Sequence, residues 1–238
     1  MNENSSKKPL SVRNTLRTIV SCFRSKKAFK SADYWEQRYR VGGNLGSGSY
    51  GLLAGWKADF INDLVSKNAI ERVLELGSGD GNQLSLARYP KYMGFDVSET
   101  SINRCKKRFS DRDWSFHVYS PENFARLGNR FRPQLVMSLD VIYHLIEDDV
   151  YSDHMKALFH LDSDFVVIYS SNGNMTVQNA HVRDRRFTDW ISIYAAGWAL
   201  TTKIENPYPW DPKHPDDTSF ANFYLFQKRQ KLLTTSSG

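Results

Sequence analysis

The residues best placed to do chemistry form a glycine-rich turn behind an apolar run. The segment ERVLELGSGDGNQLSLA places Gly77, Gly79 and Gly81 in a GxGxG pattern, with Glu75 before the turn and Asp80 inside it. Glycines at a strand-to-helix turn let the backbone approach a ligand closely. A dinucleotide site normally has the pattern GxGxxG and binds a pyrophosphate, which these two acids would repel. The acids instead favour a ligand that carries an amine.

Asp96 is the second part of this candidate site. It ends the apolar run KYMGFD, nineteen residues after Gly77. An acidic side chain at this point of a nucleotide-binding unit accepts hydrogen bonds from the hydroxyls of a ribose. The turn and the acid together predict one site for a ligand with an amine and a nucleoside, whereas glycines alone would fit a tight turn of purely structural role.

A third group of polar residues follows a later apolar run, in LVMSLDVIYHLIEDD. Ligands bind at the carboxyl ends of strands in a doubly wound sheet, so Asp140, Tyr143 and His144 are expected to face one site. A hydroxyl that acts as a nucleophile benefits from a base, and histidine is the usual one. We expect His144 to be the base, with a purely structural histidine as the alternative. Asp140 would orient the base or contact the ligand.

A metal held by Asp140 with Glu147 or Asp148 is a further alternative. We assign no metal, because acids at this point also suit the N-terminus of a helix. The segment HVRDRRFTDW, after another apolar run, offers His181 as an alternative base. Its arginines, Arg183 and Arg185 among them, are expected to bind an anionic or polyhydroxylated substrate, with a solvated basic turn as the alternative.

The elements around these residues alternate between strands and helices. Strand patterns cover about 71–76, 92–96, 113–118, 134–139 and 164–170. Helical patterns cover about 31–40, 52–65, 82–89, 99–109, 121–127, 148–160 and 184–196. Such alternation predicts a parallel sheet covered on both faces. The apolar runs 198–204 and 220–227 are joined by a segment with four prolines, which excludes a crossover helix and predicts an antiparallel edge hairpin.

Two segments, ELGSGDG at 75–81 and FDVS at 95–98, resemble the first two motifs of class I S-adenosylmethionine-dependent methyltransferases. The resemblance covers about residues 31–228. It implies a Rossmann-like α/β fold with a seven-stranded, mostly parallel sheet and an antiparallel C-terminal hairpin. The implied cofactor is S-adenosylmethionine, with its methionine part on the glycines, its ribose on Asp96 and its adenine on Val97. The other expected cofactor contacts are Glu75, Ser78, Asn82, Leu139 and, for the adenine amine, Ser120 and Glu122.

The segment YWEQRY is typical of an N-terminal lid over the cofactor in related small-molecule methyltransferases. Its expected contacts with the cofactor are Trp35, Arg38 and Tyr39, and the glycine-rich stretch up to residue 51 would act as a hinge. Together with SLDVIYHL and HVRDRRFTDW, this lid is similar to methyltransferases encoded with, or fused to, glycosyltransferases of surface polysaccharide synthesis. That similarity implies O-methylation of a sugar or glycan hydroxyl, with Tyr143, Arg183 and Arg185 as substrate contacts.

Two other functions stay open: methylation of a free small molecule such as a secondary metabolite, and a non-catalytic binding module of the same fold. No NPPY or DPPY follows the fourth strand, so the resemblance argues against methylation of nucleic-acid bases. Charge agrees with this, since residues 1–40 hold ten of the 32 Lys and Arg against three Asp and Glu. The remaining 198 residues are close to neutral and lack the basic surface of a nucleic-acid binder.

The predicted division is a basic N-terminal arm at 1–30, a methyltransferase domain at 31–230 with its lid at 31–51, and a disordered tail at 231–238. Leu16, Ile19, Val20 and Phe23 recur at helical spacing in the arm. This pattern predicts an amphipathic helix that contacts a membrane surface or a glycosyltransferase, or else packs on the domain. Two cysteines and the lack of an apolar spanning run favour the cytoplasm, with peripheral attachment at the inner face of the membrane.

Overall fold

The computed structural model describes residues 29–173, 175 and 179–229. Its helices are α2 (Ser31–Arg40), α3 (Gly51–Lys67), α4 (Glu99–Arg108), α5 (Pro121–Phe131), α6 (Asp148–His160) and α7 (Phe187–Tyr194), with short 3₁₀ helices η2 (Ser47–Ser49), η3 (Gln83–Leu86) and η4 (Ile142–His144). Its strands are β1 (Arg72–Leu76), β2 (Lys91–Asp96), β3 (Trp114–Val118), β4 (Leu135–Leu139), β5 (Phe165–Ser170), β6 (Trp198–Ile204) and β7 (Asn222–Lys228). Nearly all of the predicted arm and the whole predicted tail lie outside the described residues.

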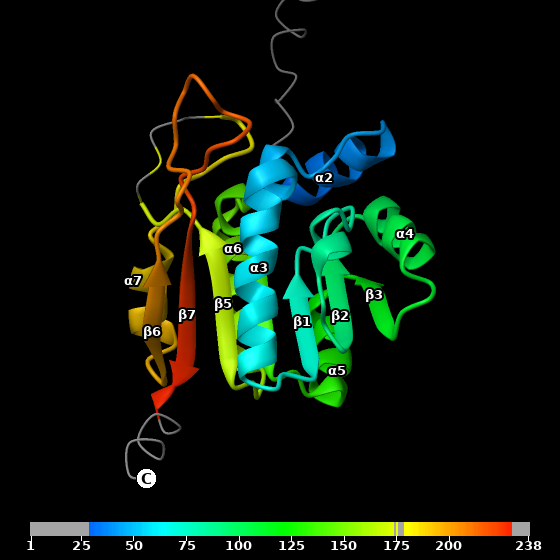
Figure 1. The fold of residues 1–238 in the computed structure, drawn as a ribbon, viewed down its shortest axis with the longest axis vertical. Coiled ribbons are helices and arrows are strands. Elements are labelled where there is room, and N and C mark those ends of the chain that lie inside the picture. Colours follow the sequence, from blue (N-terminus) through cyan, green and yellow to red (C-terminus); the bar gives the residue numbers. More distant parts are fainter. Residues whose placement is uncertain (1–28, 174, 176–178, 230–238) are drawn as a thin grey trace, which may run out of the picture.

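The strands form one sheet in the order β3-β2-β1-β4-β5-β7-β6 (Figure 1). Strands β1 to β5 run parallel, whereas β7 pairs antiparallel with both β5 and β6. The predicted α/β fold with an antiparallel C-terminal hairpin is thereby confirmed. The strand order changes direction between β1 and β4, and the ends of these two strands therefore flank the crevice in which such sheets bind ligands.

Apolar side chains fill both faces of the sheet. In β4, Leu135 and Met137 pack with the buried residues of α3 and α4, while Val136 between them packs with those of α5 and α6. Figure 1 shows α3 in front of the sheet and α5 and α6 behind it. Burial on both faces explains why the parallel strands are continuous apolar runs in the sequence.

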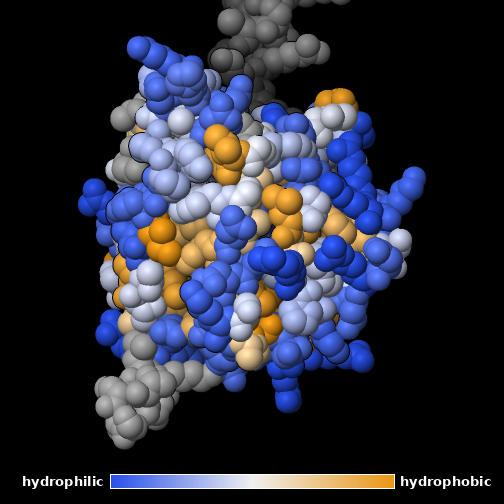
Figure 2. Space-filling view, in the orientation of Figure 1, coloured by the Kyte–Doolittle hydropathy of each residue, from blue (hydrophilic) through white to orange (hydrophobic). Residues whose placement is uncertain are grey.

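The outer surface is mixed in character. On the side that carries α3, hydrophobic residues form small groups among hydrophilic ones (Figure 2). Among the residues that the structure describes, no helix has the length and apolar character needed to cross a membrane.

The helix predicted at 82–89 is wrong, because only the 3₁₀ helix η3 forms there. The Ser85 hydroxyl donates to the Asn82 carbonyl at 2.6 Å, a local bond that competes with helical bonding. Ala87 is already extended, and Pro90 favours extended backbone at Tyr89 before β2 begins. The chain thus has no room for a full helix between the turn and the second strand.

The helix predicted at 184–196 is shorter than expected and begins at Phe187. Asp184 is used otherwise: its carboxylate accepts from the Ser171 hydroxyl at 2.8 Å and from the backbone N–H groups of Gly173 and Met175 at 3.2 and 2.8 Å. These bonds fasten the loop that follows β5. Helix α5 differs in the opposite sense, because it extends to Phe131, beyond the predicted end at residue 127.

Candidate functional site

The glycine turn folds back from β1 onto the end of β2. The backbone N–H groups of Gly77 and Ser78 both donate to the Phe95 carbonyl, at 2.7 and 3.0 Å. Gly77 and Gly79 have φ angles of 95° and 56°, in the left-handed region that other residues rarely adopt. A Cβ on Gly77 would lie 2.3 Å from Val141 Cγ2. Glycine is therefore required here both by the backbone angle and by the available space.

Asp96 is joined directly to this turn. Its carboxylate accepts from the Gly79 N–H and from the Ser98 N–H, each at 2.9 Å. The side chain is buried, and this burial raises its pKa, while the two backbone bonds act in the opposite direction. Each oxygen keeps a lone pair that can accept from a ligand hydroxyl. The structure thus brings together the two motifs that the sequence placed in one site.

The two acids of the first motif have different surroundings. Glu75 is buried, accepts from the Tyr92 hydroxyl at 2.6 Å, and has its pKa raised to about 7 by burial. Asp80 faces the lid, where its carboxylate accepts from the Leu45 N–H at 3.2 Å and from the Tyr50 hydroxyl at 3.0 Å. Of the two, Asp80 is the one in contact with the lid.

Several expected cofactor contacts lie around the ends of β2, β3 and β4. Val97 is 40% exposed and presents an apolar surface, whereas Leu139 is buried. Ser120 caps α5 by accepting from the Asn123 N–H at 3.1 Å, and Glu122 is exposed in the first turn of that helix. The Ser78 hydroxyl is buried with no hydrogen-bond partner among the described residues.

The lid helix α2 is fastened to the same strand ends. Glu36 accepts from the hydroxyls of Ser98 and Thr100, both at 2.6 Å. Arg104 of α4 donates to the carbonyls of Tyr39 and Gly43. No sequence argument had singled out Glu36 or Arg104, since their partners lie more than 60 positions away along the chain.

The expected lid residues Trp35, Arg38 and Tyr39 all lie on this helix. Tyr39 is buried, and its ring centroid lies 5.8 Å from that of Trp35. Arg38 donates to the Asn44 carbonyl at 2.6 Å, within the glycine-rich stretch. The hinge segment also touches the glycine turn, because a Cβ on Gly79 would lie 2.3 Å from Leu45 Cδ2. The Asn82 side-chain amide also binds the hinge segment, because it donates to the Ser49 carbonyl at 2.8 Å.

Asp140, at the end of β4, forms an ion pair with a fully buried lysine. Its Oδ2 accepts from the Lys57 ammonium at 2.5 Å, and its Oδ1 accepts from the Tyr143 hydroxyl at 2.7 Å. The Asp140 backbone is left-handed, with a φ of 59°. Lys57 is fully buried in α3 and was missed by the sequence analysis. The signal was present, because Lys57 stands on the apolar stripe of that helix with Leu53, Ala54 and Ile61.

His144 lies in an aromatic cluster under the lid. Its Nδ1 donates to the His181 carbonyl at 3.0 Å, which fixes the tautomer with a free lone pair on Nε2. Burial lowers the His144 pKa to about 4, so the ring is neutral at pH 7. The Trp35 ring packs edge-on against it, with centroids 4.9 Å apart, and Tyr34 stacks on His181 at the same distance.

Arg183 and Arg185 bind the segment between η4 and α6. Both guanidinium groups pair with Asp148 and donate to the Ile146 carbonyl. Arg185 also lies over the Tyr151 ring, 4.4 Å from its centroid. In this arrangement, the two arginines hold the segment that directly follows the candidate base.

The acids that follow β4 have separate partners. Asp140 binds Lys57, Asp148 binds the two arginines, and Glu147 accepts from the Ser31 N–H at 2.8 Å. Within residues 29–173, 175 and 179–229, no group of three or more His, Cys, Asp or Glu side chains is arranged to hold a metal ion.

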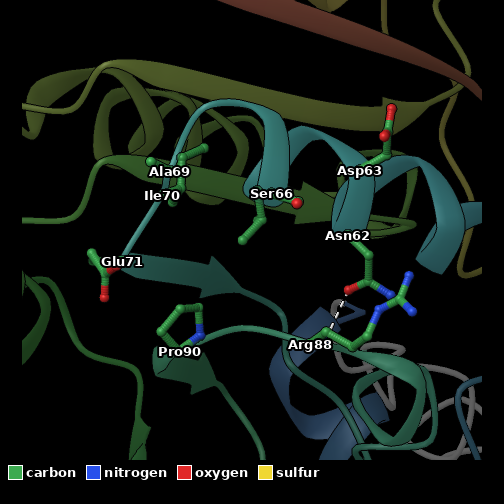
Figure 3. Close-up of a pocket in the computed structure, with 9 residues that line it drawn as sticks. Asn62, Asp63, Ser66, Ala69, Ile70, Glu71, Arg88 and Pro90 are labelled. Carbon is green, nitrogen blue, oxygen red and sulfur yellow. Dashed lines mark hydrogen bonds between the residues drawn. The ribbon is translucent and has the colours of Figure 1, made fainter.

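A separate pocket lies at the other end of the sheet (Figure 3). It is lined by the last turns of α3, by the residues that lead into β1, and by Arg88 and Pro90 before β2. The Arg88 backbone N–H donates to the Asn62 side chain at 2.8 Å across it. Since these residues precede the strands whose far ends carry the glycine turn and Asp96, this pocket is not part of the candidate site.

The sheet order and the hairpin define the Rossmann-like fold of class I methyltransferases. No protein-family model matches the chain, and no curated protein matches it in sequence. Among solved structures, it is similar to the N-methyltransferase NodS from Bradyrhizobium japonicum in complex with S-adenosylhomocysteine, with a TM-score of 0.62 and 14% identity over 84% of this chain and 100% of that one.

Two further solved structures have the same fold. One is the magnesium protoporphyrin IX methyltransferase ChlM from Synechocystis with bound S-adenosylhomocysteine, with a TM-score of 0.60 and 14% identity over 89% of this chain and 99% of that one. The other is the methyltransferase domain of bacterial CtHen1-C, with a TM-score of 0.57 and 18% identity over 73% and 97%. At these identities, the likeness is one of fold.

Proposed function

We propose that this chain is an S-adenosylmethionine-dependent methyltransferase. The observation that carries the proposal is the left-handed glycine turn joined to buried Asp96 at the switch point of a methyltransferase fold. The site suits such a cofactor: the glycines allow a tight left-handed turn at the end of β1, Asp96 keeps lone pairs for a ribose, and Val97 offers an apolar surface for a base. The buried Ser78 hydroxyl, which lacks a partner in the described part, is a further group that a ligand could satisfy.

The cofactor supplies an electrophilic methyl group on a positively charged sulfur. In the proposal, Gly77, Gly79 and Gly81 hold its methionine part, and Asp96 holds its ribose. Lid helix α2 closes over these strand ends, held by Glu36. A closed lid excludes water and keeps the reacting groups in place.

For the acceptor, we propose a hydroxyl of a sugar or glycan. The neutral His144 ring, with its lone pair on Nε2, is in the state needed to take the proton of that hydroxyl. The rings of Tyr34 and Trp35 around it add the apolar, aromatic lining that ligand sites commonly have. The similar solved structures include a magnesium protoporphyrin IX methyltransferase and a small RNA methyltransferase. Because their named acceptors differ, they do not indicate which acceptor this chain uses.

The proposed setting is the cytoplasm, where residues 1–30 would contact the inner face of the membrane or a glycosyltransferase. This part of the proposal rests on the basic and amphipathic pattern of that segment.

The cofactor assignment is tested by titration calorimetry with S-adenosylhomocysteine. We expect the wild-type protein to bind it and Asp96→Ala to lose roughly 1.5–3 kcal/mol of binding free energy, since a charged acceptor is removed from the ribose. Asp113→Ala, which removes an exposed carboxylate at the start of the neighbouring strand, is the matched control and should bind as the wild type does. Unchanged affinity in Asp96→Ala, or binding of NAD instead, contradicts the assignment.

The acceptor is then sought by offering a panel of glycans, and free small molecules beside them, with a radiolabelled methyl donor. Transfer to a glycan supports the proposed substrate class, and transfer to small molecules alone contradicts it. Each reaction is repeated with a chelator, because loss of activity would indicate a metal that activates the hydroxyl in place of His144.

A further inference from the structure

Lys57 is a fully buried cation at the end of the sheet where the candidate site lies. Its ammonium is 2.5 Å from Asp140 Oδ2 and 5.1 Å from the centroid of the Tyr169 ring. A buried ammonium is retained only when a counter-charge and well-directed hydrogen bonds offset its desolvation. The position of Lys57 is thus tied to that of Asp140.

Asp140 lies against the glycine turn and beneath the lid. The next residue, Val141, touches Gly77 so closely that a Cβ there would lie 2.3 Å from its Cγ2. A Cβ on Gly48, in the lid segment, would lie 3.2 Å from Asp140 Oδ2. The second carboxylate oxygen binds the Tyr143 hydroxyl. The Lys57–Asp140 pair therefore lies beside the glycine turn and the lid, the two parts that would enclose the proposed cofactor.

The charge at this place changes during the proposed reaction. A lone pair of the acceptor oxygen forms the new O–CH₃ bond, the S–CH₃ bond breaks with its electrons passing to sulfur, and the acceptor proton leaves to the base. The positive charge on sulfur is therefore lost as the methyl group moves. A carboxylate without a counter-charge would stabilise the charged ground state more than the transition state, and this difference would slow transfer.

We propose that Lys57 is a positioning residue that acts through Asp140, neutralising this carboxylate and fixing it on Tyr143 so that the transfer site does not over-stabilise a positively charged donor. The inference rests on the proposed function. In the intact pair, the two charges offset each other, and the Tyr143 hydroxyl, whose proton is directed at Asp140, keeps its lone pairs for other contacts.

The test uses the two forms of the cofactor, which differ by one methyl group and one positive charge. Dissociation constants for S-adenosylmethionine and S-adenosylhomocysteine are measured by calorimetry on the full chain at pH 7 and low salt. Lys57→Met should shift the ratio of the two constants toward S-adenosylmethionine by roughly 5- to 50-fold, because an unpaired carboxylate then attracts the charged form. Asp140→Asn should shift it the opposite way, and the double variant should return it close to the wild-type ratio.

Lys67→Met is the matched control, since it removes a lysine of the same helix that pairs with Asp63 on the surface. Its ratio should equal that of the wild type. A purely structural lysine would lower both affinities together, and the double variant would not restore the ratio.

Unchanged ratios in folded Lys57→Met and Asp140→Asn would overturn the inference while leaving the proposed cofactor intact. If Lys57→Met does not fold, as judged by circular dichroism, the test rests on Asp140→Asn and the double variant. A shift of the ratio toward S-adenosylhomocysteine in Asp140→Asn that the double variant reverses supports the inference. Ratios equal to that of the wild type refute it. Failure of the wild type to bind either form instead refutes the proposed function, and the inference with it.

Discussion

At the scale of single residues, the candidate base His144 and the residue expected to orient it, Asp140, do not bind each other. His144 takes its orientation from the His181 carbonyl, while the carboxylate of Asp140 is occupied by Lys57 and Tyr143. The imidazole is therefore held neutral by burial, which outweighs the His181 carbonyl and the Asp140 carboxylate, both of which raise its pKa. Such a histidine would take up the proton of the acceptor hydroxyl during methyl transfer itself, and not before it.

This arrangement makes a prediction about the pH dependence of methyl transfer. Because burial lowers the His144 pKa to about 4, the ring stays unprotonated well below the usual histidine value of 6.5. Initial rates should therefore be nearly constant from pH 7.5 to about 5.5 and decline only below that range. A decline centred near pH 6.5 would contradict His144 as the base.

Substitution gives the complementary test. His144→Ala should lower turnover by about 10²–10⁴-fold, the usual contribution of a positioned base, and leave the affinity for S-adenosylhomocysteine nearly unchanged. His181→Ala is the comparison, since its ring stacks on His144, with centroids 5.6 Å apart. A larger loss in His181→Ala than in His144→Ala contradicts the assignment.

At the scale of elements, the position of helix α2 depends on one side chain. Glu36 accepts three hydrogen bonds from the first turn of α4 and the residue before it, and the bonds from the Ser98 and Thr100 side chains lower its pKa. The bonds are made to the ionised carboxylate, so they are present above the ordinary glutamate pKa of 4.5 and are lost as the pH falls below it.

We predict that Glu36→Ala loosens the lid without unfolding the domain. Three bonds to a largely solvated carboxylate should contribute about 1–2 kcal/mol to the docking of α2. Amide hydrogens of residues 31–40 should then exchange roughly 5- to 30-fold faster, as measured by mass spectrometry, while those of α5 keep their rates.

Asp33→Ala is the matched control for this prediction, because Asp33 is an exposed acid in the first turn of the same helix. Its exchange rates should remain close to those of the wild type. Equal acceleration in both variants would mean that loss of negative charge on α2, and not the Glu36 clamp, loosens the helix.

At the scale of the whole molecule, buried histidines should limit stability in acid. His154 of α6 is buried against the Ser138 hydroxyl of β4, 2.9 Å from its Nε2, and burial lowers its pKa to about 4. The unfolded chain binds a proton at this histidine below pH 6.5, whereas the folded protein does not until about pH 4. The stabilisation is therefore complete above pH 6.5 and is lost as the pH falls toward 4.

Between pH 7 and pH 5, His154 should account for about 2 kcal/mol of lost unfolding free energy. The measurement is urea denaturation at the two pH values. His154→Gln, which cannot take up a proton, should reduce the loss by about that amount, whereas His160→Gln, an exposed position on the same helix, should not. An equal loss in wild type and His154→Gln would contradict the prediction.

The sequence was sufficient for most of the fold because the signals there are local and repeated. Continuous apolar runs marked the strands buried on both faces, and the four prolines before β7 excluded a crossover helix. Two helices are shorter than predicted. In each, a side chain within the predicted range, Ser85 or Asp184, binds backbone groups in place of regular helical bonding.

In the candidate site, the sequence by itself determined the glycine turn and Asp96, because a left-handed turn after a strand and an acid after the next strand are fixed by spacing. Tertiary structure alone decided the partners of each charge. Lys57 and Asp140 stand 83 positions apart, and Glu36 stands 62 positions from Ser98. Which side chains meet depends on how α2 and α3 pack against the strand ends, and a pattern within one segment carries no information about that packing.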